Sequence, residues 1–167
     1  MGALRIVVVR GGRGLDNRRG TAETADMLIQ GDTILEIGPP GVPAPADATE
    51  IDANGKLLIP GLINSHTHGH GSFAKGTGDR GSLELLLNGG PAHTANRHHQ
   101  DNYLATLLSA AEMVRKGCTA AYDLTFEFPG PSREGLEAVG RAYADIGMRA
   151  VIAPMMADRT FYQAIPG

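Results

Sequence analysis

Two histidines, His66 and His68, stand one residue apart at the end of a short apolar run. Alternate residues of a β-strand project from the same face, so both imidazoles are expected to point the same way, with Thr67 turned away. Two neutral imidazoles at the end of a buried strand can share one divalent cation. The tripeptide alone also fits a hydrogen-bonded pair near a loop, but Pro60-Gly61 before it and Gly69 after it favour a metal site.

The apolar residues before the histidines do not alternate with polar ones. Leu58, Ile59, Leu62 and Ile63 follow one another with only Pro60-Gly61 between them. Such a run is typical of a strand that is buried on both faces, as in a parallel sheet covered by helices.

The segment from Gly55 to His68, GKLLIPGLINSHTH, resembles the signature of the amidohydrolase superfamily. In that family the signature closes a small β-domain and opens a metal-bearing (β/α)₈ TIM barrel. It is most similar to the branch that holds triazine chlorohydrolases, guanine deaminase and adenosyl-homocysteine-type deaminases. The resemblance implies that His66 and His68 are metal ligands from the first barrel strand, and that the metal is zinc, with iron and manganese as alternatives.

The elements around the motif predict an α/β protein. Apolar segments bounded by turn residues predict strands at residues 4–10, 25–30, 33–37, 49–51 and 56–58. The first strand is expected to end at Gly11-Gly12, and Gly31-Asp32 is expected to close a hairpin. Residues 1–58 are therefore predicted to form part of a small β-sandwich-like domain.

After the motif, strands alternate with helices. Helices are predicted at residues 83–87, 100–116 and 132–146, and strands at 118–124 and 149–154. Strand, helix, strand in this order predicts parallel pairing through right-handed crossovers. Residues 59–167 are thus expected to hold the first three strands and helices of an incomplete barrel, because a complete one needs about 250 residues.

Two further side chains are candidates for substrate binding. His70, just beyond the strand, is either a substrate contact or proton relay beside the metal, or a loop histidine in solvent. Asp123, near the end of the second barrel strand, either faces the pocket or caps the following loop. Both alternatives stay open for each residue.

The composition limits the partners. A formal net charge of −3 gives no reason to expect nucleic acid or an anionic membrane. No apolar run approaches a membrane span. The single cysteine, Cys118, fits a reducing compartment, so a cytoplasmic location is predicted. A small-molecule substrate is expected, and a homo-oligomer stays open.

The preferred hypothesis is a metal-dependent hydrolase that acts on a non-peptide C–N bond, such as a deaminase of an aminated heterocycle, through metal-activated water. The general acid/base and the remaining ligands are expected beyond Gly167. The 167 residues are therefore predicted to be an inactive N-terminal part, completed by the rest of the same protein or by a second chain. A non-catalytic scaffold is the alternative, against which the intact pair of His66 and His68 argues.

Overall fold

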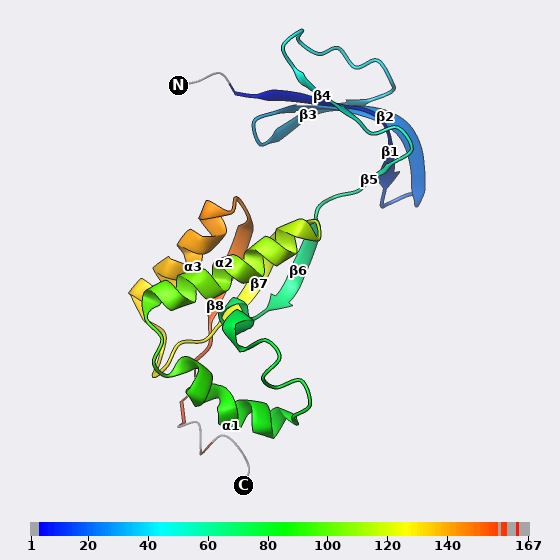
Figure 1. Cartoon of the computed structure of the whole chain (residues 1–167). Helices are drawn as coiled ribbons and strands as arrows, with labels where there is room; N and C mark the ends of the chain where they lie inside the picture. Colours follow the sequence, from blue (N-terminus) through cyan, green and yellow to red (C-terminus); the bar gives the residue numbers. More distant parts are fainter. Residues whose placement is uncertain (1–3, 157, 160–162, 164–167) are drawn as a thin grey trace. The chain divides into compact units, whose positions relative to one another are not determined.

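The computed structural model describes residues 4–156, 158, 159 and 163, and it divides the chain into two compact units. The first unit is Met1–Pro60 and the second is Gly61–Gly167. The boundary predicted from the sequence lies two residues earlier, between residues 58 and 59. Each unit is described by itself below (Figure 1).

The described strands of the first unit form one sheet. They are β1 (Ile6–Asp16), β2 (Thr21–Gln30), β3 (Thr33–Gly38), β4 (Thr49–Asp52) and β5 (Leu57–Leu58). The order is β3-β2-β1-β4, with β5 also paired to β1; β1, β2 and β3 run antiparallel, whereas β4 and β5 run parallel to β1. The predicted hairpin between β2 and β3 is confirmed, with Gly31 at φ 61° in its turn. The second layer of a sandwich is not among the described residues.

The first strand does not end at Gly11-Gly12, so that prediction is wrong. It continues to Asp16, and its register against β2 shifts between Val9 and Gly12. Gly11 lies at φ 68°, a left-handed conformation that glycine adopts without steric cost. A Cβ on Gly12 would lie only 2.6 Å from Leu58 Cγ. The two glycines therefore form a bulge that lets the strand bend past β5 instead of stopping it.

A buried carboxylate holds this bulge in place. Asp26, which is 2 % exposed, accepts hydrogen bonds from the backbone N–H of Gly11 at 2.9 Å and from that of Gly41 at 2.8 Å. Arg10 Nη1 donates a third at 2.8 Å. These bonds stabilise the charged form and lower the pKa of Asp26 to about 2. Asp26 thus joins β1, β2 and the connector after β3.

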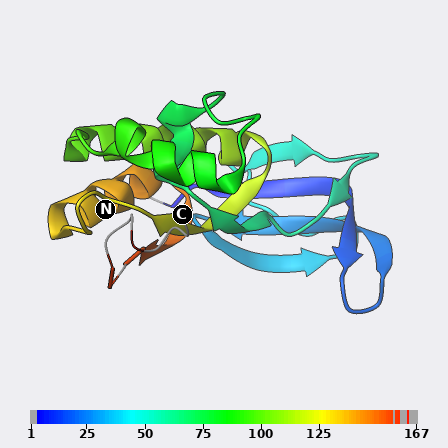
Figure 2. The same ribbon diagram turned by 90° about the horizontal axis from the view of Figure 1, so that it is seen from below.

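The second unit alternates strands and helices. It contains β6 (Leu62–Thr67), the 3₁₀ helix η1 (Gly69–Ala74), α1 (Leu83–Thr94), α2 (His99–Arg115), β7 (Cys118–Thr125), α3 (Arg133–Asp145) and β8 (Arg149–Pro154). The three strands lie in the order β6-β7-β8 and all run parallel, which confirms the predicted pairing. Helices α2 and α3 lie side by side (Figures 1 and 2).

One face of this sheet is covered and the other is open in the described chain. The core cluster joins α2, β7 and α3 through residues such as Met113, Ala121 and Tyr143. On the opposite face, Tyr122 and its cross-strand partner Val151 are 42 % and 57 % exposed. Apolar side chains of the described sheet are therefore exposed on this face. None of the described helices is both long and apolar enough to cross a membrane.

The helices differ from the sequence prediction in two places: the 3₁₀ helix η1 was not predicted, and α1 is longer than expected. Helix α1 was expected to end at Leu87, but it continues through Gly89 and Gly90 to Thr94. Neither glycine has a positive φ, so both keep a helical backbone. A glycine inside a helix costs only about 1 kcal/mol relative to alanine, which does not by itself end the helix. The predicted helix at residues 100–116 is confirmed by α2.

Candidate metal centre

The two histidines of the motif lie at the carboxyl end of β6, with their rings close together. His66 is the penultimate residue of the strand and His68 follows its last residue. Their ring centroids are 4.9 Å apart and their planes meet at 86°. Both side chains belong to exposed residues. The arrangement leaves both imidazoles open to a ligand at the end of the sheet where parallel α/β folds carry their sites.

A hydrogen bond to the neighbouring strand sets the tautomer of His68. Its Nδ1 lies 2.9 Å from the carbonyl oxygen of Leu124 in β7. A carbonyl oxygen only accepts, so Nδ1 carries the hydrogen and Nε2 keeps a free lone pair. Histidines that bind metal ions usually donate their second N–H in this way. The donor set of His68 and His66 therefore fits a divalent metal ion of the zinc type.

Asp123 lies beneath the motif and is fully buried. Its Oδ1 accepts from the backbone N–H of Gly69 at 3.1 Å, and its Oδ2 accepts from the phenol of Tyr143 at 2.8 Å. Burial raises the pKa of this carboxyl group, against the opposing effect of the two hydrogen bonds. Burial also raises the pKa of Tyr143, so the phenol keeps its proton and donates. This geometry favours a capping carboxylate over a pocket residue, although the loop that it caps follows β6 and not its own strand.

His70 continues the row of rings. Its centroid is 5.6 Å from that of His68 and 6.1 Å from that of Phe126. The backbone N–H of Phe126 donates to His70 Nδ1 at 3.2 Å, so the hydrogen of the neutral ring is on Nε2. Burial, together with the nearby charges of His68 and Arg97, lowers the pKa of His70 to about 4. His70 is thus a half-buried, neutral hydrogen-bond donor at pH 7.

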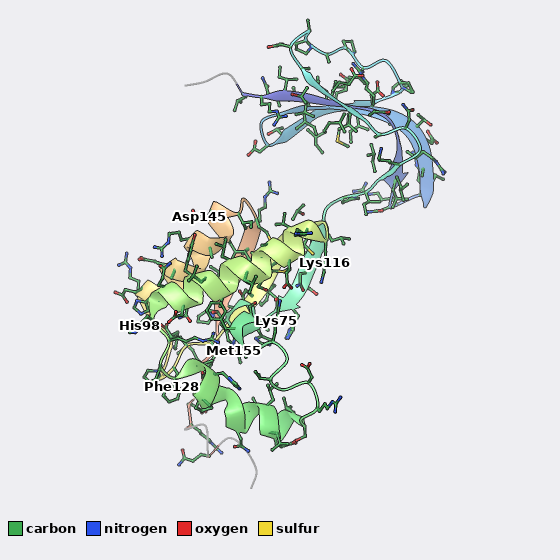
Figure 3. All side chains as sticks on the ribbon, in the orientation of Figure 1. Lys75, His98, Lys116, Phe128, Asp145 and Met155 are labelled. Carbon is green, nitrogen blue, oxygen red and sulfur yellow. The ribbon has the colours of Figure 1, made fainter. Side chains whose placement is uncertain are left out.

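The described residues bring no third metal ligand to this pair. Within that part of the chain, no three His, Cys, Asp or Glu side chains gather closely enough to hold an ion. The histidines near α2 lie elsewhere: His98 precedes that helix at the end opposite Lys116 (Figure 3), and His99 Nε2 is 3.5 Å from Glu127. Protein zinc sites use at least three protein ligands, so His66 and His68 alone would not complete one.

Several contacts of the site have no signal in the sequence. Arg97 lies 5.6 Å from the ring centroid of Phe73 and donates to the carbonyl oxygen of His70. Lys75 pairs with Glu112 at 2.5 Å and so ties the end of η1 to α2 (Figure 3). Each of these cations is a single basic residue in a loop. Only the packing of the loops after β6 shows what they contact.

The chain matches the model of the amidohydrolase family over residues 57–165. It is 37 % identical over 134 residues to a 5'-deoxyadenosine deaminase of Methanocaldococcus jannaschii, which covers 80 % of this chain and 30 % of the relative. It is 34 % identical over 139 residues to a 5-methylthioadenosine/S-adenosylhomocysteine deaminase of Pyrococcus furiosus, covering 83 % and 31 %. The chain therefore spans less than a third of the length of these relatives.

Solved structures show the same similarity. A triazine hydrolase from Arthrobacter aurescens superimposes with a TM-score of 0.75 at 27 % identity, over 89 % of this chain and 35 % of the other. A mutant of the atrazine chlorohydrolase of Arthrobacter aurescens, complexed with zinc and atraton, gives a TM-score of 0.77 at 26 % identity, over 88 % and 35 %. With its signature segment and two histidines at the end of a parallel strand, the chain belongs to the amidohydrolase family.

Proposed function

We propose that the protein is a metal-dependent hydrolase that acts on a non-peptide C–N bond, and that its substrate is an aminated heterocycle. In such a reaction the oxygen of water bonds to the ring carbon, the C–N bond breaks, and the amino group leaves as ammonia after gaining one proton from the water, whose other proton stays with the product. The observation that carries the proposal is the pair of adjacent imidazoles, with His68 Nε2 free to bind because Nδ1 is bonded to Leu124. The relatives that act as deaminases support this reaction class.

His66 and His68 would hold the metal ion, for which zinc is the first candidate and iron and manganese are alternatives. When bound, such an ion supplies Lewis acidity, which lowers the pKa of water toward 7. Leu124 keeps the His68 ring in the tautomer that binds. His70 would contact the substrate: its Nε2–H is a donor suited to a ring nitrogen or to the leaving amino group. His70 itself is a poor ligand, because its only lone pair is engaged by the N–H of Phe126.

We also propose that β6, β7 and β8 are the first three strands of a (β/α)₈ barrel, preceded by part of a β-domain in Met1–Pro60. Tyr122 and Val151 would then face the barrel interior, which explains why apolar side chains remain open on that face. The missing metal ligands and the proton-transfer group would come from outside the described residues. The 167 residues alone are expected to lack activity, because two ligands do not complete a site.

The test uses the protein as its gene encodes it, called the full-length protein below. It is purified without chelators and analysed for zinc, iron and manganese, and ammonia release is measured with 5'-deoxyadenosine, 5-methylthioadenosine and an aminotriazine. We expect about one metal ion per chain and activity with at least one aminated heterocycle. His66→Ala and His68→Ala should lose both, whereas His93→Ala, an exposed histidine of α1, should keep both. A metal-free protein would instead support a non-catalytic scaffold.

A further inference from the structure

Two hydrogen bonds join consecutive residues of β7 to consecutive residues at the end of β6. Leu124 accepts at its carbonyl oxygen from His68 Nδ1, at 2.9 Å. Asp123 accepts at Oδ1 from the backbone N–H of Gly69, at 3.1 Å. The first bond fixes the rotation of the His68 ring, and the second fixes the main chain directly after it. Together they determine where His68 Nε2 lies.

Asp123 is also hydrogen-bonded to helix α3. Its second carboxylate oxygen accepts the phenol hydrogen of Tyr143 in α3 at 2.8 Å, and both side chains are buried, at 0 % and 2 % exposure. A buried carboxylate is tolerated only when its oxygens are hydrogen-bonded. Two direct hydrogen bonds, one at each oxygen of Asp123, thus connect α3 to the turn after β6.

The turn after β6 packs closely against the carboxylate of Asp123. A Cβ on Gly69 would lie 2.6 Å from Asp123 Oδ2 and 3.3 Å from Thr106 Cγ2. Real Cβ atoms do not approach other atoms to 2.6 Å, so the carboxylate occupies the space that a side chain at position 69 would need. The absence of a side chain at Gly69 therefore lets its backbone N–H come close enough to donate to the Asp123 carboxylate.

We propose that Asp123 is a positioning residue of the metal centre, which holds His68 in its binding orientation through the main chain of Gly69 and is held in turn by Tyr143. It touches neither substrate nor metal. The inference rests on the proposed function for its effect on metal affinity, whereas its effect on the His68 ring is independent of any metal.

Two measurements on the full-length protein test this role. The first is affinity for Zn²⁺ in competition with a chelator, and the second is the tautomer of the His68 ring in the metal-free protein, read from its ¹⁵N shifts. Loss of a partner that orients a metal-binding histidine typically costs about 10- to 100-fold in affinity. We expect Asp123→Ala to show such a loss and to mix the two tautomers of His68. Tyr143→Phe should show a smaller change in the same direction.

A matched control exists on α3, the helix that carries Tyr143. Tyr103 in α2 donates to Asp145 at the end of α3 at 2.9 Å, on the surface (Figure 3). Tyr103→Phe removes a similar bond between the same kinds of side chain, and it should leave Zn²⁺ affinity and the His68 tautomer unchanged. A change as large as that of Asp123→Ala would mean that general loosening of the α2–α3 pair, and not positioning, causes the effect.

The proposal is overturned if Asp123→Ala folds and keeps wild-type Zn²⁺ affinity and a single His68 tautomer. Should Asp123→Ala not fold, Tyr143→Phe decides by the same two measurements, because it preserves the volume of the side chain. Should the wild-type protein bind no metal, the proposed function fails, while the tautomer of His68 in the variants still supports or contradicts the positioning role.

Discussion

His70 accepts a hydrogen bond at Nδ1 from the backbone N–H of Phe126, 3.2 Å away. This contact determines which ring nitrogen of His70 carries the hydrogen. With Nδ1 engaged and the ring neutral, Nε2 carries the hydrogen and can only donate. The ring centroid of His68 lies 5.6 Å from that of His70. In His68 the hydrogen is on the other nitrogen, because Nδ1 donates to the carbonyl oxygen of Leu124. The two neighbouring rings therefore differ in what Nε2 can do: in the proposed function, that of His68 would bind a metal ion and that of His70 would donate to a hydrogen-bond acceptor.

His70→Phe is expected to weaken the reaction without removing the metal ion. Phenylalanine keeps the ring contacts with His68 and Phe126 but removes the Nε2–H donor, together with the Nδ1 acceptor of the Phe126 N–H. Loss of one such hydrogen bond costs about 1 kcal/mol, or roughly five-fold in kcat/KM. Steady-state kinetics and metal analysis of the full-length protein check this. A variant that loses its metal ion would show instead that His70 is a ligand.

The sequence predicted the elements that depend on local periodicity. Helix α2 and strand β7 were predicted from local residue patterns, and the structure has both close to the predicted bounds. The apolar stripe from which α2 was predicted is not its buried face, because Leu104, Leu108 and Val114 are exposed. The buried residues of the helix are Asn102, Ala105, Thr106, Ala110 and Met113. The spacing of His66 and His68 likewise predicted rings on one side of a strand, and their centroids lie 4.9 Å apart.

The contacts that orient His68 and hold Asp123 could not be predicted from local patterns. Leu124, which orients His68, is 56 residues away along the chain and acts through its carbonyl oxygen, so its side chain gives no signal. Tyr143 fits the apolar stripe of α3 as a core residue, and only the packing of α3 on the sheet brings its hydroxyl to Asp123. The prediction that Gly89-Gly90 ends α1 was wrong. A glycine ends a helix where its backbone adopts a left-handed conformation, and neither of these glycines has a positive φ.

Acidification is expected to destabilise the first unit through Asp26. The pKa of this carboxyl group is lowered from 3.8 to about 2 by the N–H groups of Gly11 and Gly41 and by Arg10. As the pH falls, the unfolded chain binds this proton before the folded chain does. The stability that Asp26 contributes is therefore fully present above about pH 4 and is lost as the pH falls toward 2.

Thermal unfolding followed by circular dichroism between pH 7 and pH 2.5 measures this loss. Asp26→Asn should lower the unfolding temperature at pH 7 and should show a weaker further decrease below pH 4. Asp47→Asn, at an exposed aspartate of the same unit, is the control and should follow the wild-type curve. If Asp26→Asn has the same pH profile as the wild type, another carboxyl group causes the acid sensitivity.

Ser132→Ala is expected to destabilise the second unit by about 1 kcal/mol. Ser132 Oγ accepts from the backbone N–H of Gly135 at 3.0 Å and so caps the first turn of α3. Ser82→Ala provides the matched comparison, since Ser82 stands at the same position before α1 but makes no capping hydrogen bond there. Urea unfolding of both variants should show the larger decrease in midpoint for Ser132→Ala. Equal decreases would mean that the capping bond contributes nothing measurable.

Gly69→Ala is expected to damage both folding and metal binding, because of space and not because of backbone conformation. Gly69 has no positive φ, so alanine could adopt its backbone. Its Cβ, however, would lie 2.6 Å from Asp123 Oδ2, and such overpacking in a buried site typically costs 1–3 kcal/mol. Gly71→Ala is the control two residues along, because a Cβ there would meet no atom within 4 Å.

The pair Gly69→Ala and Asp123→Ala separates the two effects by a double-mutant cycle. If the added methyl group acts by colliding with the carboxylate, removing that carboxylate relieves the collision. The double variant should then be less destabilised than the sum of the single variants, by urea unfolding. Its Zn²⁺ affinity should stay as low as that of Asp123→Ala alone, because the hydrogen bond that fixes the turn is still absent. Additive stability effects would show that the methyl group and the carboxylate do not meet.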